Sequence, residues 1–176
     1  MTAPAASASR PALSQLALGD FDHELSITRR VLERVPDAHW DYKPHPKSMS
    51  LGQLAGHLSN IPHWGALTLG GSELDFAAGG PPQPRPATRD ALLENFDAAA
   101  VSARVALSGA DDAHLGGTYT VRNGERVVMA MPRAAMLRGM ILSHMIHHRG
   151  QLSVYLRLLD VPVPSIYGPS ADEGGA

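Results

Sequence analysis

The last long apolar segment of the chain, residues 132–159, begins at Pro132 and contains no further proline, so it is predicted to form one helix. His144 and His148 lie four residues apart within it. In a helix, such a pair is separated by only ~40° around the axis and by one turn along it. Both histidines follow the apolar positions of the segment, so both side chains are predicted to point into the interior. A chain with this segment is therefore expected to place two inward-facing imidazoles beside each other.

Three earlier segments carry the spacing of amphipathic helices. The first is predicted over residues 11–35, where apolar side chains recur every three or four positions. The second is predicted to begin at Leu51, because Ser50 and Gln53 have the spacing of a capping box. The third is predicted to begin after Thr88.

The period changes from helical to alternating between the third and the last of these helices. Residues 119–129 alternate around Asn123-Gly124, a dipeptide typical of a two-residue hairpin turn. We therefore predict an all-α fold class, a four-helix bundle with a small β-hairpin before the last helix. Residues 1–9, rich in Ala and Ser, are predicted to be a disordered tail, and residues 10–176 a single domain.

The composition removes several classes of function. The 176 residues include no cysteine, which excludes disulfides, cysteine–zinc sites and cysteine nucleophiles, so histidine and carboxylate are the strong metal ligands left. The net charge of −2 gives no electrostatic reason to expect a nucleic acid partner. No apolar run reaches ~18 residues, so no membrane span is expected. Because no signal-peptide pattern is present either, we expect a cytoplasmic protein.

A third histidine, His57, is predicted to face inward from the second helix, about one turn from both Leu54 and Ile61. Any one of the three histidines alone would more simply be a hydrogen-bonded core or interface residue. An inward pair four residues apart, together with a third inward histidine on another helix, favours a metal site instead. Met145 stands where a zincin motif needs glutamate, so metalloprotease chemistry is not predicted.

Residues around the three histidines are candidates for a supporting role. His147 lies about 100° from His148 around the helix and is predicted to face away from the site. Gln151 and Tyr155 follow His148 by one and two turns and would line a pocket; the alternatives are a surface amide and ordinary packing, respectively. A ligand histidine usually donates its second N–H to an acceptor. The first helix offers three carboxylates for this role, between which the sequence does not choose: Asp20, Asp22 and Glu24.

Four stretches of the chain together resemble the DinB-like metal-binding superfamily. They are WDYKPHPKSMSLG at 40–52, LAGHL at 54–58, HMIHHRGQ at 144–151 and LRLLDVPVPSIYGPSADE at 156–173. The resemblance covers the chain from about residue 18 to its end. It implies an up-down-down-up four-helix bundle, usually a homodimer, with a divalent metal on three histidines that map onto His57, His144 and His148. Characterised relatives include thiol-dependent transferases and isomerases that use bacillithiol or mycothiol.

The donor set and the resemblance together lead to a functional hypothesis. Three neutral imidazoles leave a coordination position open, which is typical of catalytic or ligand-binding sites. We expect a metal-dependent, thiol-linked transferase of small molecules, whose partners are a small-molecule substrate and a low-molecular-weight thiol. The alternatives are a metal-dependent hydrolase and a non-catalytic metal-binding stress-response dimer. The metal is not identified by these residues, since imidazole suits zinc, nickel and iron alike.

Two features of the predicted structure bear on these hypotheses: the first distinguishes an enzyme from a non-catalytic protein, and the second concerns assembly. A cleft of several hundred Å³ beside the histidines would favour an enzyme with a substrate, whereas a sealed site would favour the non-catalytic protein. The third helix is apolar around much of its circumference, which together with the resemblance predicts a homodimer through helix faces.

Overall fold

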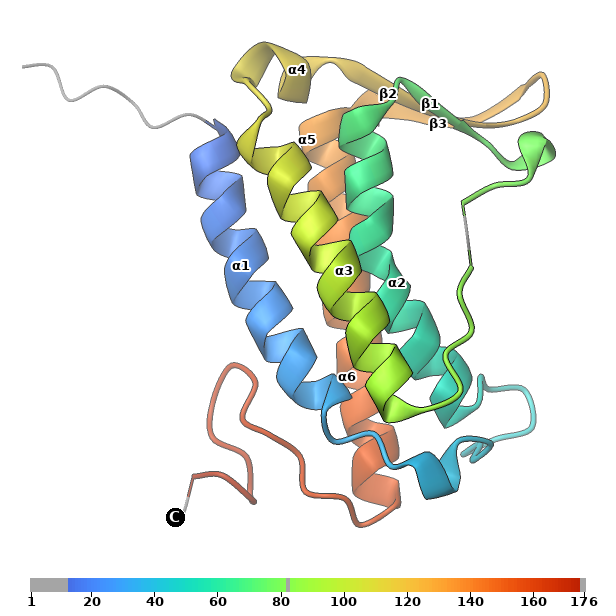
Figure 1. Ribbon diagram of the computed structural model, residues 1–176, viewed down its shortest axis with the longest axis vertical. Helices are drawn as coiled ribbons and strands as arrows, with labels where there is room; N and C mark the ends of the chain where they lie inside the picture. The colour runs from blue at the N-terminus through green and yellow to red at the C-terminus, as the bar shows by residue number, and fades with distance from the viewer. Residues whose placement is uncertain (1–12, 82, 175–176) are drawn as a thin grey trace, which may run out of the picture.

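The computed structural model describes residues 13–81 and 83–174, and shows a mostly helical chain with one small sheet (Figure 1). The predicted tail 1–9 lies outside these residues. The long helical segments are α1 (Leu13–Leu32), α2 (Leu51–Gly70), α3 (Arg89–Ser108) and a final segment made of α5 (Arg133–Met136), η3 (Leu137–Ser143) and α6 (His144–Leu158). Each corresponds to a predicted helix: α2 and α3 begin where they were predicted to begin, and the ends of α1 and of the final segment are shifted by one to three residues.

The four long segments lie alongside one another around a common core. Helices α1 and α2 each contact both α3 and α6. Figure 1 shows α1 and the final segment running in one direction, and α2 and α3 running in the opposite direction. Buried apolar side chains from all four form one continuous cluster, which includes Leu32, Leu54, Leu58, Phe96, Met145 and Leu152.

Local hydrogen bonds explain where two of the helices begin. The backbone N–H of Gln53 donates to Ser50 Oγ at 3.2 Å, and the backbone N–H of Ser50 donates to Gln53 Oε1 at 2.8 Å. This capping box satisfies two backbone donors at the start of α2 and confirms the predicted start at Leu51. Thr88 Oγ1 likewise accepts from the Ala91 N–H at 3.2 Å and caps α3.

The predicted hairpin is present, but it belongs to a larger sheet. Strands β2 (Thr118–Asn123) and β3 (Arg126–Pro132) are antiparallel, and Gly124 in their turn has φ +60°, a conformation that favours glycine. A third strand, β1 (Glu73–Asp75), pairs parallel to β2. The mostly helical fold and the hairpin agree with the prediction, whereas β1 was not predicted. Three residues are too few to show the alternation from which a strand is predicted.

Other short elements connect the long helices. They are η1 (Asp37–His39), η2 (Phe76–Ala78) and α4 (Asp112–Gly116). In the connection that contains η2, Asp75 Oδ1 accepts from the N–H groups of Ala77 and Gly124, each at 2.9 Å, and so ties β1 to the hairpin turn. Across the described residues, no helix has both the length and the apolar character needed to cross a bilayer.

The final segment contains a π-helical turn that its apolar periodicity did not predict. Over η3 the wider turn adds about one residue, so positions before and after it are offset around the axis. Met140, within η3, is 37 % exposed. His148 is buried as predicted, together with Leu137, Ile141 and Leu152 of the same segment.

A buried arginine joins α6 to α1 and to the chain that follows α6. Arg149 Nη2 lies 2.7 Å from the carboxylate of Glu24, and Arg149 Nη1 donates to Thr28 Oγ1 at 3.1 Å. Arg149 Nη2 also donates to the Tyr167 hydroxyl at 2.6 Å, and this hydroxyl donates to Glu24 at 2.8 Å. The network holds residues after α6 against the helices.

Candidate metal centre

The three predicted histidines converge on one point between α2 and α6. His57 Nε2 lies 3.2 Å from His144 Nε2, and His144 Nε2 lies 2.8 Å from His148 Nε2. One ring nitrogen from each residue falls within 4.8 Å of the other two. The spacing of four residues brings His144 and His148 together, whereas the packing of α2 beside α6 brings in His57. Among the described residues, this is the one group of three or more histidines and carboxylates close enough to share an ion.

The contacts of the Nδ1 atoms indicate which ring nitrogen is free to bind a metal ion. His148 Nδ1 lies 2.8 Å from Gln151 Oε1, an acceptor, so Nδ1 carries the proton and Nε2 presents a lone pair. His144 Nδ1 is buried without a hydrogen-bond partner among the described residues; burial lowers the pKa of His144, and the nearby Met140 backbone offsets only part of this effect. Gln151 thus has the orienting contact that ligand histidines commonly have.

Burial keeps the three imidazoles uncharged near neutral pH. The pKa of His57 falls to about 4, first because the ring is buried and then because His148 and His144 lie beside it. Burial is also the main reason why the pKa values of His144 and His148 are lowered. A metal binds neutral imidazole, so the site is already in the protonation state that binding requires.

The donor set and its surroundings fit a divalent ion. Nitrogens bound tetrahedrally at about 2.0–2.1 Å from an ion lie ~3.3 Å apart. The spacing of 3.2 Å between His57 and His144 is close to this value, and that of 2.8 Å between His144 and His148 is shorter. The Trp64 ring packs against His57 and His144, with centroids 5.4 and 5.7 Å away. Trp64 Nε1 and His144 Nδ1 are both buried without a partner in the described part of the chain. Such unpaired groups are uncommon in folded proteins and are often found at functional sites.

An open cleft of about 580 Å³ has His57, one of the three histidines, in its wall. The loop after η1 lines one side through Trp40 and Met49, and residues 83–87 line another. Trp40 lies directly over Gly52, where an added Cβ would fall 2.1 Å from the indole nitrogen. Any larger residue at position 52 would therefore displace this wall.

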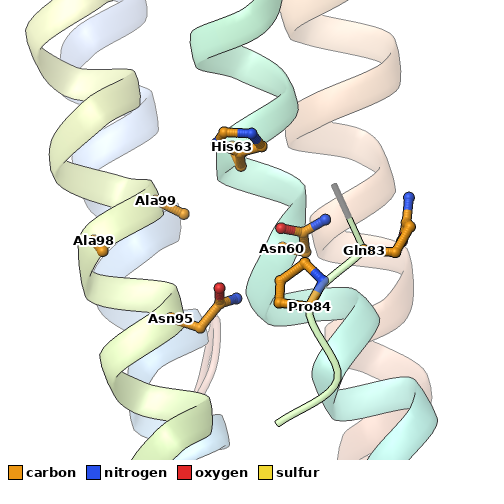
Figure 2. A pocket seen from close by; sticks show the side chains of 7 residues that line it. All are labelled: Asn60, His63, Gln83, Pro84, Asn95, Ala98 and Ala99. Carbon is orange, nitrogen blue, oxygen red and sulfur yellow. The ribbon is translucent and has the colours of Figure 1, made fainter. Parts of the chain in front are cut away.

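Other candidates from the sequence lie elsewhere. His147 is exposed, as predicted. Tyr155 donates to the Met49 carbonyl at 3.2 Å and packs edge-on against Tyr42, so its contacts are those of a packing residue. His63 lines a separate cavity of about 480 Å³ between α2 and α3 (Figure 2).

The carboxylates of α1 do not provide the acceptor expected for a ligand histidine. Asp22 pairs with Arg104, and Glu24 pairs with Arg149. Asp20 lines a small cavity between α1 and the final segment. The observed acceptor, Gln151, comes from the same helix as the histidine that it contacts.

The fold and the site together define the class of protein: a mostly helical chain in which the Nε2 atoms of three histidines converge and could bind one metal ion. The sequence matches the DinB family over residues 13–174, so the chain belongs to this family. The uncharacterized protein YrdA of Bacillus subtilis is 25% identical over 157 residues, which cover 89% of each chain.

Two solved structures share the fold. A DinB-like protein from Bacillus cereus has a TM-score of 0.67 at 22% identity, over 87% of this chain and 97% of that one. The DinB-like protein YjoA from Bacillus subtilis has a TM-score of 0.64 at 18% identity, over 90% of this chain and 98% of that one.

Replacing Gln151 with alanine tests whether its contact matters. We expect ~10–100-fold weaker metal binding, because His148 loses the acceptor that orients its ring. Gln151→Glu, which retains an acceptor, should bind as tightly as the wild type or more tightly. Titration with Zn²⁺ against a competing chelator measures both variants. Unchanged affinity in Gln151→Ala would show that the contact plays no part in binding.

Proposed function

We propose that this chain binds one divalent metal ion through His57, His144 and His148 and acts as a thiol-linked transferase of small molecules. The observation that carries the proposal is the convergence of three Nε2 atoms beside an open cleft of about 580 Å³. Zinc, nickel and iron all suit this donor set.

The residues would divide the work as follows. A divalent ion on three neutral histidines would act as a Lewis acid with an open position, and would lower the pKa of a thiol or water bound there. Gln151 would hold His148 in the ligating tautomer. Trp64 would limit the access of water from its side, because its ring covers His57 and His144.

The cleft favours an enzyme over a non-catalytic metal protein, since it offers room for a substrate next to His57. The chain has no cysteine, so a thiol used in the reaction must come from solution. In the transfer, the thiol loses its proton to solvent and its sulfur bonds to an electrophilic carbon. The leaving group departs with the electron pair of the bond that breaks.

The test is turnover of the electrophile monochlorobimane by zinc-loaded protein, with and without a low-molecular-weight thiol. We expect turnover above the uncatalysed rate only when both metal and thiol are present, and none in His148→Ala. His147→Ala is the matched control and should retain the wild-type rate. Hydrolysis of an ester panel with metal alone would favour the hydrolase instead. If a broad panel of thiols and electrophiles gave no turnover with metal bound, the non-catalytic alternative would replace the transferase.

We also propose that the fold is the up-down-down-up four-helix bundle of the family and that the protein is a homodimer through α3. Val101 and Val105, four residues apart on α3, are 63 % and 67 % exposed, which supports an apolar contact surface there. We expect light scattering at micromolar concentration to give a dimer, and Val101→Glu to give a monomer. Val127→Glu, on the hairpin, should remain dimeric. A wild-type monomer would contradict the assignment.

A further inference from the structure

Arg85 is an arginine in the wall of the cleft that contains His57. Most arginines of the described chain have a partner, such as Asp22 for Arg104 and Glu24 for Arg149. Within residues 13–81 and 83–174, the Arg85 side chain is exposed and makes no hydrogen bond or ion pair. Its five N–H donors are therefore available to a ligand in the cleft.

The backbone holds the segment of Arg85 against α2 beside His57. Prolines at 84 and 86 flank it and restrict its backbone on both sides. Pro86 packs against α2 at Gly56, where an added Cβ would fall 3.4 Å from Pro86 Cδ. Gly56 immediately precedes His57. Figure 2 shows the neighbouring Pro84 in front of α2, where it also borders the second cavity beside Asn60.

Two charged side chains line the cleft, the guanidinium of Arg85 and one carboxylate. Asp41 is the one carboxylate among its lining residues, and it forms no ion pair with Arg85 in the described part of the chain. The remaining polar lining consists of uncharged groups such as Ser50 and Gln53. Because the charges of Arg85 and Asp41 cancel, the cleft would become positive, and would favour an anion, with a divalent ion on the histidines.

We propose that Arg85 forms a carboxylate subsite, and that the substrate thiol carries a carboxylate at the end opposite its sulfur. The inference rests on the proposed function, because it places the sulfur at the histidine centre. A guanidinium and a carboxylate form paired, charge-assisted hydrogen bonds, which fix orientation as well as add affinity. Arg85 would thus select the thiol and direct its sulfur toward His57.

The experiment compares two thiols that differ only at the far end. Cobalt-loaded protein is titrated with 6-mercaptohexanoate and with 6-mercapto-1-hexanol, and the thiolate-to-cobalt absorption band reports binding. We expect the carboxylate to bind ~10-fold more tightly. Arg85→Gln should lower its affinity to that of the alcohol. Arg126→Gln, which removes the same charge from the hairpin, should leave the preference intact. Equal affinities in the wild type, or a preference that survives Arg85→Gln, would overturn the subsite.

Failure of the proposed function would look different, because neither thiol would then change the cobalt spectrum. In that case the subsite is tested by itself, through the backbone amide NMR signals of residues 83–87 with hexanoate and 1-hexanol. Shifts with hexanoate alone, lost in Arg85→Gln, would support a carboxylate subsite without the thiol chemistry. No shift with hexanoate would overturn it.

Discussion

Replacing His144 with alanine is expected to reduce metal affinity by more than ~100-fold, beyond the effect of losing an orienting contact. His144 Nε2 lies 3.2 Å from His57 Nε2 and 2.8 Å from His148 Nε2. Its removal would leave two of the three proposed ligands. The measurement is metal content after dialysis, together with a Zn²⁺ titration against a chelator.

The matched control is His147→Ala, three residues further along the chain. His147 is exposed, and its ring lies 4.9 Å from that of His148, so its loss removes an imidazole next to the centre without removing a proposed ligand. Its metal content should equal that of the wild type. Both variants should retain their helical circular dichroism, since the core side chains lie elsewhere. Full metal occupancy in His144→Ala would refute the three-histidine centre.

Replacing Arg149 with methionine is expected to lower the free energy of unfolding by about 3–5 kcal/mol. The side chains of Arg149 and Glu24 are only 1 % and 12 % exposed, so the variant would leave a carboxylate buried without its cation. The bond from Arg149 to the Tyr167 hydroxyl would also be lost, which loosens the chain after α6. Urea unfolding followed by circular dichroism measures the change.

Two further variants separate the effect of burial from that of charge. Arg104→Met breaks a pair with Asp22 whose side chains are 49 % and 40 % exposed, and should lower the free energy of unfolding far less than Arg149→Met does. Glu24→Gln combined with Arg149→Met should recover part of the lost stability, because no buried charge is left unpaired. If Arg149→Met were as stable as Arg104→Met, the buried network would contribute little.

Arg149 also shows which signal in the sequence was missed. Met145, Arg149, Leu152 and Leu156 recur at helical spacing and are all buried, so an arginine occupies an apolar face of α6. A buried arginine needs a buried carboxylate partner. The periodicity could therefore have predicted that such a partner exists. Periodicity could not have named Glu24, which lies 125 residues earlier in the chain.

The elements that the sequence predicted well depend on interactions between residues close in the chain. The capping box at Ser50 and Gln53, the cap at Thr88 and the turn at Gly124 each involve groups within about three residues. The pairing of His144 with His148 follows from helix geometry in the same way. Helix starts, the hairpin turn and two of the three proposed ligands were therefore predictable without a fold.

Tertiary structure decided the rest, because its contacts join residues far apart in the chain. His57 meets His144 across 87 residues only because α2 packs beside α6. Strand β1 is too short to be recognised by pattern, and it pairs with β2 through contacts that the fold supplies. The cleft exists because the fold brings the loop at Trp40, the segment at Arg85 and α2 together as its walls. Short-range geometry sets the helices and turns, whereas the packing of side chains between helices determines which of their faces meet and what lies between them.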